Sequence, residues 1–204
     1  MVNSQMKRIY LLILSVALLS IFSTGCLYAV RYDGTYHGRV VDQETREPIE
    51  GVVVLGTWSV YHFDPGGGSH TYYDAREAVT DKNGEFTILG EGLRILSSLE
   101  PMNFMIFKAS YQYREYQWST LKIDIPAKEK EQTQWEGEIP IFPLRKLTNK
   151  ERNLNTLTFP HTPPTEASLS KVKLMLREIN KEAIARGVNP LDKWRGENIP
   201  RERD

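Results

Sequence analysis

The sequence lacks the features that mark several protein classes. Cys26 is the only cysteine among 204 residues, so no disulfide can form within the chain. Lys plus Arg and Asp plus Glu both number 26, and no basic stripe is visible, which argues against a nucleic-acid partner. The longest apolar run falls short of the roughly 20 residues that a helix needs to cross a bilayer. Nucleic-acid-binding and ordinary membrane-spanning proteins are therefore disfavoured.

The first 25 residues have the three parts of a secretory signal peptide. Lys7 and Arg8 precede the apolar run "IYLLILSVALLSIF", and small residues follow it. Such a short run between a basic start and a small-residue exit is typical of an export signal. Thr24 and Gly25 directly before Cys26 resemble the bacterial lipoprotein cleavage box. The resemblance implies a signal peptide over 1–25, a lipid anchor on Cys26 and therefore a membrane as partner.

The anchor gives the lone cysteine a role in an exported chain, where an unpaired thiol is otherwise unusual. The alternative is an unmodified cysteine in a discarded leader. Residues 26–35 then form a linker. Leu27, rather than aspartate, follows the cysteine, so nothing resembles an inner-membrane retention signal. We expect a location in the bacterial cell envelope, at the outer membrane in a Gram-negative host.

Residues 36–145 are predicted to form an all-β, antiparallel sandwich. Short runs rich in Val, Ile, Tyr, Phe and Trp alternate with turn residues, which is the pattern of sandwich domains. The expected strands are "YHGRVVD", "GVVVLGTWSVYHF", "TYYDAREAVT", "GEFTIL", "NFMIFKASY", "YREYQWST", "LKIDIP" and "EGEIPIFPL".

A tight turn is predicted between the third and fourth of these runs. In "VTDKNGEFTI", Asp81 is placed to cap the turn through its carboxylate, and Gly84 to take the positive φ that such a turn requires. Phe86 and Ile88 then share one face of the following strand. The spacing does not fit an EF-hand calcium loop.

The same stretches resemble a known family. Its pattern is Gly-x-Val-x-Asp-x-x-Thr-x-x-Pro-Ile-x-Gly-Val from Gly38 to Val52, then Thr-Asp-x-x-Gly-x-Phe-x-Ile from Thr80 to Ile88. These motifs resemble the carboxypeptidase regulatory-like domain, a small transthyretin-like Greek-key β-sandwich. Where the family often has a Gly-Tyr pair, this chain has Ser110 before Tyr111. The resemblance implies an accessory module and brings no catalytic residues with it.

The chain changes character after the sandwich. We expect a Pro-rich tether over 146–165, an amphipathic helix over 166–187 and a polar tail over 188–204. The helix is predicted from one apolar stripe at spacings of three and four, with Thr165 or Ser168 at its start and Gly187 at its end. The stripe consists of Leu169, Val172, Leu176, Ile179 and Ala183. It could pack on the sandwich or dock on a partner.

The stretch "HFDPGGGSH" is interpreted as a long loop between two strands, because three glycines and a proline offer little side-chain burial. It lacks the Gly-Lys-Ser/Thr ending of a phosphate loop. His62, Asp64 and His70 are chemically acceptable ligands for zinc or iron. A flexible triple glycine between them is poor preorganisation, so no metal is predicted. As a recognition loop, the stretch would act with Trp58 and Tyr72.

The aromatic run "YQYREYQWST", together with Trp58, Tyr72 and Tyr73, has two interpretations: a face that stacks on sugars or peptides, or ordinary strand alternation, which we favour. No Gly-x-Ser-x-Gly or His-Glu-x-x-His motif occurs. The sequence therefore predicts a non-enzymatic, lipid-anchored envelope module without cofactors, which binds an envelope protein or a glycan. The alternatives are a structural subunit that docks through its C-terminal helix and, less favoured, a metal-dependent hydrolase.

Overall fold

The computed structural model describes residues 4–23, 30–121, 134–154, 167 and 169–187. The chain divides into two compact units. Unit 1 comprises Met1–Gly34 and Glu91–Ser97, and unit 2 comprises Thr35–Gly90 and Ser98–Asp204. The two units are described separately. Cys26 lies outside the described residues, as do the tail over 188–204 and most of the tether over 146–165.

Unit 1 contains one helix and a two-stranded ribbon. Helix α1 (Ser4–Ser23) covers the predicted signal peptide, and its apolar side chains from Met6 to Val16 are exposed. Across the described residues, we find no helix with both the length and the apolar character needed to span a bilayer. Strand β1 (Val30–Asp33) pairs antiparallel with β6 (Gly92–Ile95). Part of the predicted linker over 26–35 is therefore a strand.

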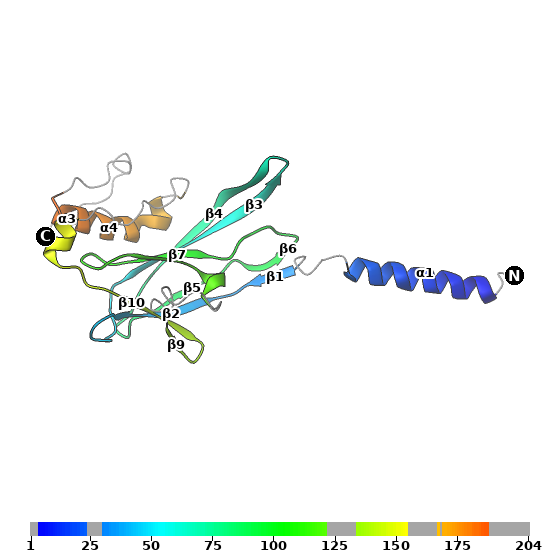
Figure 1. Ribbon diagram of the computed structural model, residues 1–204, viewed down its shortest axis with the longest axis horizontal. Coiled ribbons are helices and arrows are strands. Elements are labelled where there is room, and N and C mark those ends of the chain that lie inside the picture. The colour runs from blue at the N-terminus through cyan, green and yellow to red at the C-terminus, as the bar shows by residue number, and fades with distance from the viewer. Residues whose placement is uncertain (1–3, 24–29, 122–133, 155–166, 168, 188–204) are drawn as a thin grey trace. The chain divides into compact units, whose positions relative to one another are not determined.

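Unit 2 is built from two four-stranded sheets (Figure 1). The first has the order β5-β2-β10-β9 and the second β4-β3-β7-β8. The strands are β2 (Tyr36–Asp42), β3 (Val53–Asp64), β4 (Gly67–Val79), β5 (Glu85–Ile88), β7 (Asn103–Phe107), β8 (Arg114–Gln117), β9 (Gln134–Glu136) and β10 (Ile139–Leu144). All pairs within these sheets are antiparallel except β2 with β10, which is parallel. The prediction of an antiparallel sandwich is wrong for this pair.

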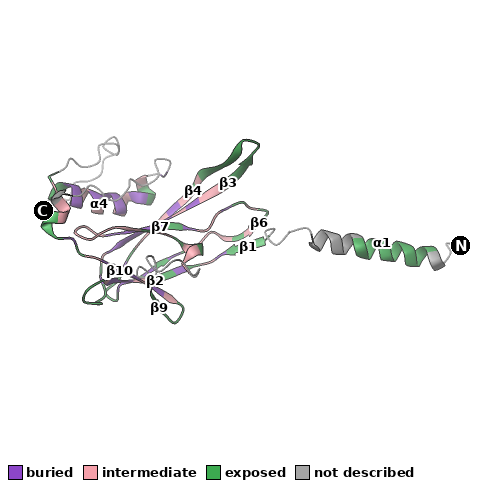
Figure 2. Ribbon diagram, viewed as in Figure 1, coloured by how far each residue is buried: buried purple, intermediate pink, exposed green. Residues whose placement is uncertain are grey.

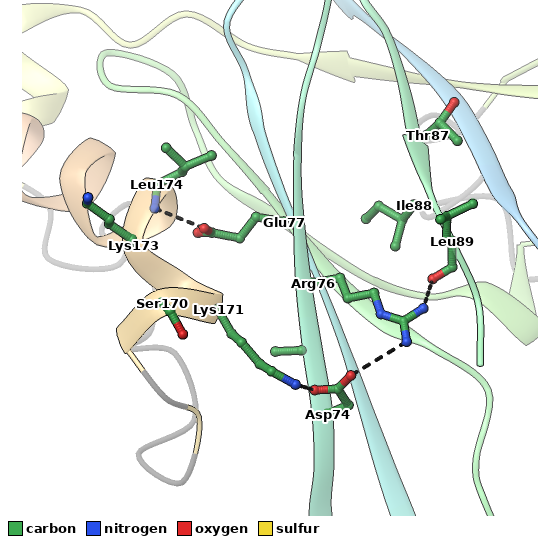
Figure 3. Close-up of a pocket in the computed structure, with 11 residues that line it drawn as sticks. Asp74, Arg76, Glu77, Thr87, Ile88, Leu89, Ser170, Lys171, Lys173 and Leu174 are labelled. Carbon is green, nitrogen blue, oxygen red and sulfur yellow. Dashed lines mark hydrogen bonds and ion pairs between the residues drawn. The ribbon is translucent and has the colours of Figure 1, made fainter.

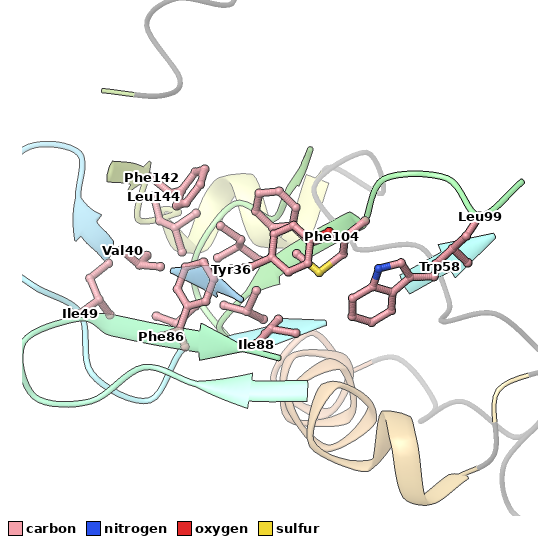
Figure 4. Packing of buried hydrophobic residues seen from close by; sticks show 14 residues of the cluster. Tyr36, Val40, Ile49, Trp58, Phe86, Ile88, Leu99, Phe104, Phe142 and Leu144 are labelled. Atoms are coloured by element: carbon pink, nitrogen blue, oxygen red, sulfur yellow. The ribbon is translucent and has the colours of Figure 1, made fainter. Parts of the chain in front are cut away.

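One apolar cluster packs between the two sheets (Figure 4). Alternate residues of each strand point into it, because successive side chains of a strand face opposite sides. The rings of Phe104, from the second sheet, and Phe142, from the first, meet edge to face with centroids 5.4 Å apart. Trp58 lies fully buried in this cluster. The mostly β architecture therefore has the two-layer arrangement of a sandwich.

Several predicted strands differ in detail from the observed ones. The run "EGEIPIFPL" does not form one strand: Gly137, at φ 61°, is in the turn that joins β9 to β10. The run "LKIDIP" lies outside the described residues, apart from Leu121. Strands β1 and β6 were not predicted. The segment 91–97 belongs to unit 1, so the predicted domain 36–145 is interrupted there.

The predicted turn before β5 is confirmed. The Asp81 carboxylate accepts hydrogen bonds from the backbone N–H groups of Asn83 and Glu85, both at 2.9 Å. Gly84 has φ 74°, and a Cβ there would lie 2.3 Å from the carbonyl oxygen of Val40. Phe86 and Ile88 are buried on one face, as expected. Only glycine fits this corner.

The C-terminal helix α4 (Leu169–Ala185) packs on the outer face of the second sheet. Its buried residues contact Val53 and Leu55 of β3, Ala75 of β4 and Phe107 of β7. The buried stripe is Val172, Met175, Leu176, Ile179 and Ala183. Of the two roles considered for the stripe, packing within the chain is the observed one. Thr165 and Ser168, the expected start, lie outside the described residues, whereas Gly187, at φ 69°, follows the helix end as predicted.

The end of α4 is held by a buried carboxylate. Glu182 is fully buried and accepts hydrogen bonds from Arg152 (2.7 and 2.9 Å), Arg186 (2.7 Å) and the backbone N–H of Ser110 (2.8 Å). Burial favours the neutral acid, but these donors outweigh it and lower the pKa of Glu182. Ser110 sits at φ 74°, in the region that favours glycine.

Arg152 comes from a short helix that the sequence did not indicate. Helix α3 (Asn149–Leu154) lies within the segment predicted as a tether. It starts with a capping box, because the Thr148 N–H donates to Glu151 at 2.9 Å and the Glu151 N–H donates to the Thr148 hydroxyl at 3.3 Å. The Thr148 backbone and Arg145 lower the pKa of Glu151 to about 2. The first part of the tether is therefore structured.

Candidate functional site

The β3–β4 hairpin, the longest among the described residues, extends beyond its own sheet. The pairing of β7 with β3 covers Val53–Thr57, whereas β3 and β4 remain paired with each other up to Asp64 and Gly67. The register shifts between Trp58 and Ser59, and such a bulge bends the strand and increases its twist. We call residues 59–72 the arm. Figure 1 shows it as a two-stranded ribbon that extends past the sheet, and Figure 2 shows its surface exposed.

The arm is ordered by pairing along its length, so the prediction of a long loop over 62–70 is wrong. Asp64 pairs with Gly67, which leaves Pro65 and Gly66 as a two-residue turn. Gly68 lies under the Tyr61 ring, since a Cβ at Gly68 would come within 2.3 Å of three of its atoms. The glycines therefore permit a close ring-to-backbone approach and a tight turn, where sequence reasoning expected only flexibility.

The register places the three candidate ligands on two faces. His62 pairs with Ser69, and Tyr61 with His70, so His62 and His70 point to opposite sides. A hydrogen bond of 2.9 Å joins His62 Nε2 and Thr71 Oγ1, and Ser69 Oγ donates to Asp64 Oδ2 at 3.0 Å. His62 and Asp64 thus share one face without His70. Among the described residues, no three His, Cys, Asp or Glu side chains are grouped to hold a metal ion.

The other face of the arm carries an aromatic and ionisable set. His70 Nδ1 lies 2.8 Å from Glu100 Oε2, and the Tyr61 and His70 rings are 5.3 Å apart. Glu100 is tied to the arm because its N–H donates to the Ser59 carbonyl at 2.8 Å. Phe63, further towards the tip, is 84% exposed. Exposed aromatic side chains beside oriented polar groups are typical of recognition surfaces.

Trp58 and Tyr72 do not belong to this surface, contrary to expectation. Trp58 is fully buried in the core, with the Arg76 guanidinium 5.4 Å from its ring centroid. Tyr72 is partly buried against the cluster under α4. Tyr111, Tyr116 and Trp118 pack against the core between the sheets. The rings of the aromatic run therefore pack against the two buried clusters and form no single exposed stacking face.

A concave region, separate from the arm, lies between β4, the end of β5 and the start of α4 (Figure 3). It has a volume of about 790 Å³ and is lined by several charged residues. Lys171 binds Asp74, which also lies 3.7 Å from Arg76. Burial raises the pKa of Asp74, whereas these contacts lower it. The net effect is a lowered pKa. These charges join the helix to the sheet.

Glu77 completes this joint between β4 and α4. Its carboxylate accepts hydrogen bonds from the backbone N–H groups of Leu174 at 3.0 Å and Met175 at 2.6 Å. Burial against the helix raises the pKa of Glu77. The Glu77 carboxylate thus accepts from two backbone N–H groups of α4, so we interpret this groove as a structural joint. Leu174 and Met175 are 97 and 98 residues from Glu77 in the sequence, so no local sequence pattern indicated this contact.

Comparisons with known proteins leave the family open. No protein-family model matches the sequence, and no curated protein matches it. A catechol 1,2-dioxygenase mutant from Acinetobacter radioresistens is a structural neighbour at 14% identity and a TM-score of 0.30. The match covers 68% of this chain and 58% of the dioxygenase chain. At that TM-score, the likeness establishes neither a shared fold nor a shared activity.

Proposed function

We propose that this chain is a non-enzymatic bacterial envelope lipoprotein that is anchored through Cys26 and presents the arm to an envelope protein or glycan. The arm carries the proposal, because its residues lie outside the core yet are held in place. Cross-strand pairing, the His62–Thr71 contact and the His70–Glu100 contact restrain side chains that do little for the core. Surface groups restrained in this way lose less entropy when a partner binds.

The sandwich is proposed to be of the carboxypeptidase regulatory-like, transthyretin-like type, with Greek-key connections. The support is that the motif residues have distinct structural roles. A Cβ at Gly38 would lie 2.7 Å from the rings of Phe86 and Phe142. Thr80 is buried, and its hydroxyl donates to the Ile49 carbonyl at 2.7 Å and accepts from the Val52 N–H at 2.8 Å. Ser110, which stands where the family often has glycine, has φ 74°, in the region that favours glycine.

The lipid anchor is supported by the signal-like segment and by the lone cysteine. Two or three acyl chains hold a protein firmly, since each buried CH2 contributes about 0.8 kcal/mol. Mass spectrometry of the chain from bacterial membranes tests this part. We expect an N-terminal peptide that begins at a lipidated Cys26, and Cys26→Ser should abolish it. A mature chain with an unmodified thiol contradicts the proposal.

Site-specific photo-crosslinking tests recognition by the arm. A photoreactive amino acid replaces Phe63 in the full chain in intact envelopes, and a matched control replaces Trp135, a 36% exposed aromatic residue of β9. We expect a discrete adduct from position 63 only. The adduct should weaken when Glu100→Ala removes the carboxylate that contacts His70. Equal labelling from both positions, or none from 63, contradicts the assignment of the arm.

The two alternative functions are less well supported. The apolar stripe of α4 is buried within the chain, so it is not available to dock on an assembly partner. The hydrolase hypothesis needs His62, Asp64 and His70 at one ion, and the register separates them. Neither alternative has an observation of its own in its favour.

A further inference from the structure

The β1–β6 ribbon of unit 1 has one face that is almost wholly apolar. Val30 pairs with Ile95, and Tyr32 with Leu93. Paired residues point to the same side of a two-stranded ribbon, so these four side chains form one surface, which we call the apolar face. Their exposed fractions are 59% for Val30, 74% for Tyr32, 62% for Leu93 and 64% for Ile95. Along both strands these exposed residues alternate with less exposed ones (Figure 2).

The opposite face of the ribbon is charged and internally paired. Arg31 Nη2 lies 3.2 Å from Asp33 Oδ1, and Arg94 Nη2 lies 3.1 Å from Glu91 Oε2. Asp33 is 3% exposed and accepts a hydrogen bond from the Glu91 N–H at 2.8 Å. The ribbon is therefore amphipathic: its polar groups have partners on one face, while apolar groups lie exposed to water on the other. Contiguous exposed apolar surface of this kind usually marks an interaction site.

The position of the ribbon in the chain indicates what covers this face. Val30 is four residues after Cys26, and four residues span at most about 14 Å, since each extends the chain by about 3.3–3.6 Å. A lipid anchor at Cys26 would thus keep the start of the ribbon within about 14 Å of the attached lipid, which is within reach of the headgroups. Tyrosine is enriched at that depth, because its ring is apolar and its hydroxyl is polar. Leu96, directly after β6, is a further exposed apolar residue, at 81%.

We infer that the apolar face of the β1–β6 ribbon lies in the membrane interface and forms a second, non-covalent contact with the lipid bilayer. This inference rests on the proposed anchor at Cys26. In addition to the acyl chains, the ribbon would bury apolar surface in the membrane. This contact would also fix the orientation of the anchored end.

The lone cysteine makes the test direct. Once Cys26 carries lipid, an introduced cysteine is the only free thiol in the chain, so Leu93→Cys can be labelled with an environment-sensitive fluorophore. Phe63→Cys on the arm is the control, since it is also a highly exposed apolar position. The labelled, lipidated full chains are reconstituted in phosphatidylethanolamine–phosphatidylglycerol vesicles, with and without lipids that carry a quencher on the acyl chain.

We expect the probe at position 93 to show blue-shifted emission and to lose intensity with quencher lipids, whereas the probe at 63 does neither. Adding Ile95→Glu should move the signal at 93 towards that of the control, because a charge at this depth is unfavourable. An unshifted, unquenched probe at 93 overturns the inference. A blue shift without quenching also overturns it, because protein then covers the face.

Failure of the inference is distinguishable from failure of the anchor. If the chain floats with vesicles but the probe at 93 reports water, the anchor stands and the ribbon contact is wrong. If mass spectrometry finds Cys26 without lipid, the proposed function itself fails at its first step.

Discussion

The two halves of the β3–β4 hairpin have opposite environments. The inner half, Val53–Trp58 with Asp74–Val79, lies between the core and α4, and Val54, Leu55 and Trp58 are at most 2% exposed. The arm beyond the bulge places Tyr61, Phe63 and His70 on the surface. One continuous pair of strands therefore provides both a buried structural part and the exposed surface proposed for recognition, and the bulge at Trp58 and Ser59 marks the border.

This difference shows how the chain combines rigidity with exposure. The inner half is stabilised by burial of apolar side chains on both faces. Such burial is the dominant favourable contribution to the free energy of folding. The arm has little burial and is held by backbone pairing, close ring packing over Gly68 and side-chain hydrogen bonds. Stability and recognition should consequently respond to different substitutions along the same two strands. The following predictions test that separation, from the largest effect to the smallest.

Trp58→Ala should have the largest effect on stability. It removes a fully buried ring from the core and leaves a cavity, which typically costs about 4 kcal/mol of unfolding free energy. Urea unfolding of the detergent-solubilised chain, followed by circular dichroism, measures the change. A loss below about 1 kcal/mol would mean that the inner half is not the structural part of the hairpin.

Glu182→Gln should have the next largest effect, through the helix that covers the inner half. Removing one partner of a buried ion network leaves Arg152 and Arg186 uncompensated, and we expect a loss of about 3 kcal/mol at neutral pH. Because the folded pKa is lowered from its ordinary 4.5, the charged Glu182 contributes stability that is fully present above 4.5. That contribution disappears as the pH falls through the lower folded pKa.

The pH dependence separates this network from simple packing. The stability difference between wild type and Glu182→Gln should narrow below pH 4.5. Lys181→Ala is the matched control on the same helix: its side chain is 65% exposed, so the change should stay within about 0.5 kcal/mol at all pH values. If the difference in unfolding free energy between wild type and Glu182→Gln stays constant down to pH 2, Glu182 is not charged in the folded state and the assignment is wrong.

Phe63→Ala should have the smallest effect on stability. The ring is 84% exposed, so the free energy of unfolding should change by less than about 0.5 kcal/mol. Binding of the proposed envelope partner, measured by chemical crosslinking in intact envelopes, should nevertheless fall. A large loss of stability would show that the arm is part of the structural half, and unchanged crosslinking would remove Phe63 from the recognition surface.

Local features of the fold were predictable from the sequence. The turn at Asp81–Gly84 and the burial of Phe86 depend on nearby residues, and the helix stripe depends on a simple period, so residue patterns were enough to find them. The sequence did not decide which surface α4 packs on, because an apolar stripe does not specify its partner. Strands β1 and β6 were missed for a similar reason: each has only four residues, and they pair across about sixty positions.

The candidate site was predicted in part. The sequence drew attention to His62, Asp64 and His70 at an exposed position, but the triple glycine was interpreted as flexibility. Strand pairing between Tyr61 and His70 overrides that local preference. Pairing also decides which face each histidine occupies, and a shift of one residue in register would reverse it. Trp58 was expected at the recognition surface, yet it is fully buried, three residues before Tyr61, the first exposed residue of β3.

The parallel contact between β2 and β10 has a consequence for the order of folding. Arg39 and Ile141 are neighbours in the first sheet although about a hundred residues separate them, and such distant pairings slow folding. Strand β2 has β5 on one side and β10 on the other, so its second edge stays open until nearly the whole sandwich has been synthesised. Until β10 has been synthesised, β2 can pair only with β5, so the first sheet cannot be completed earlier.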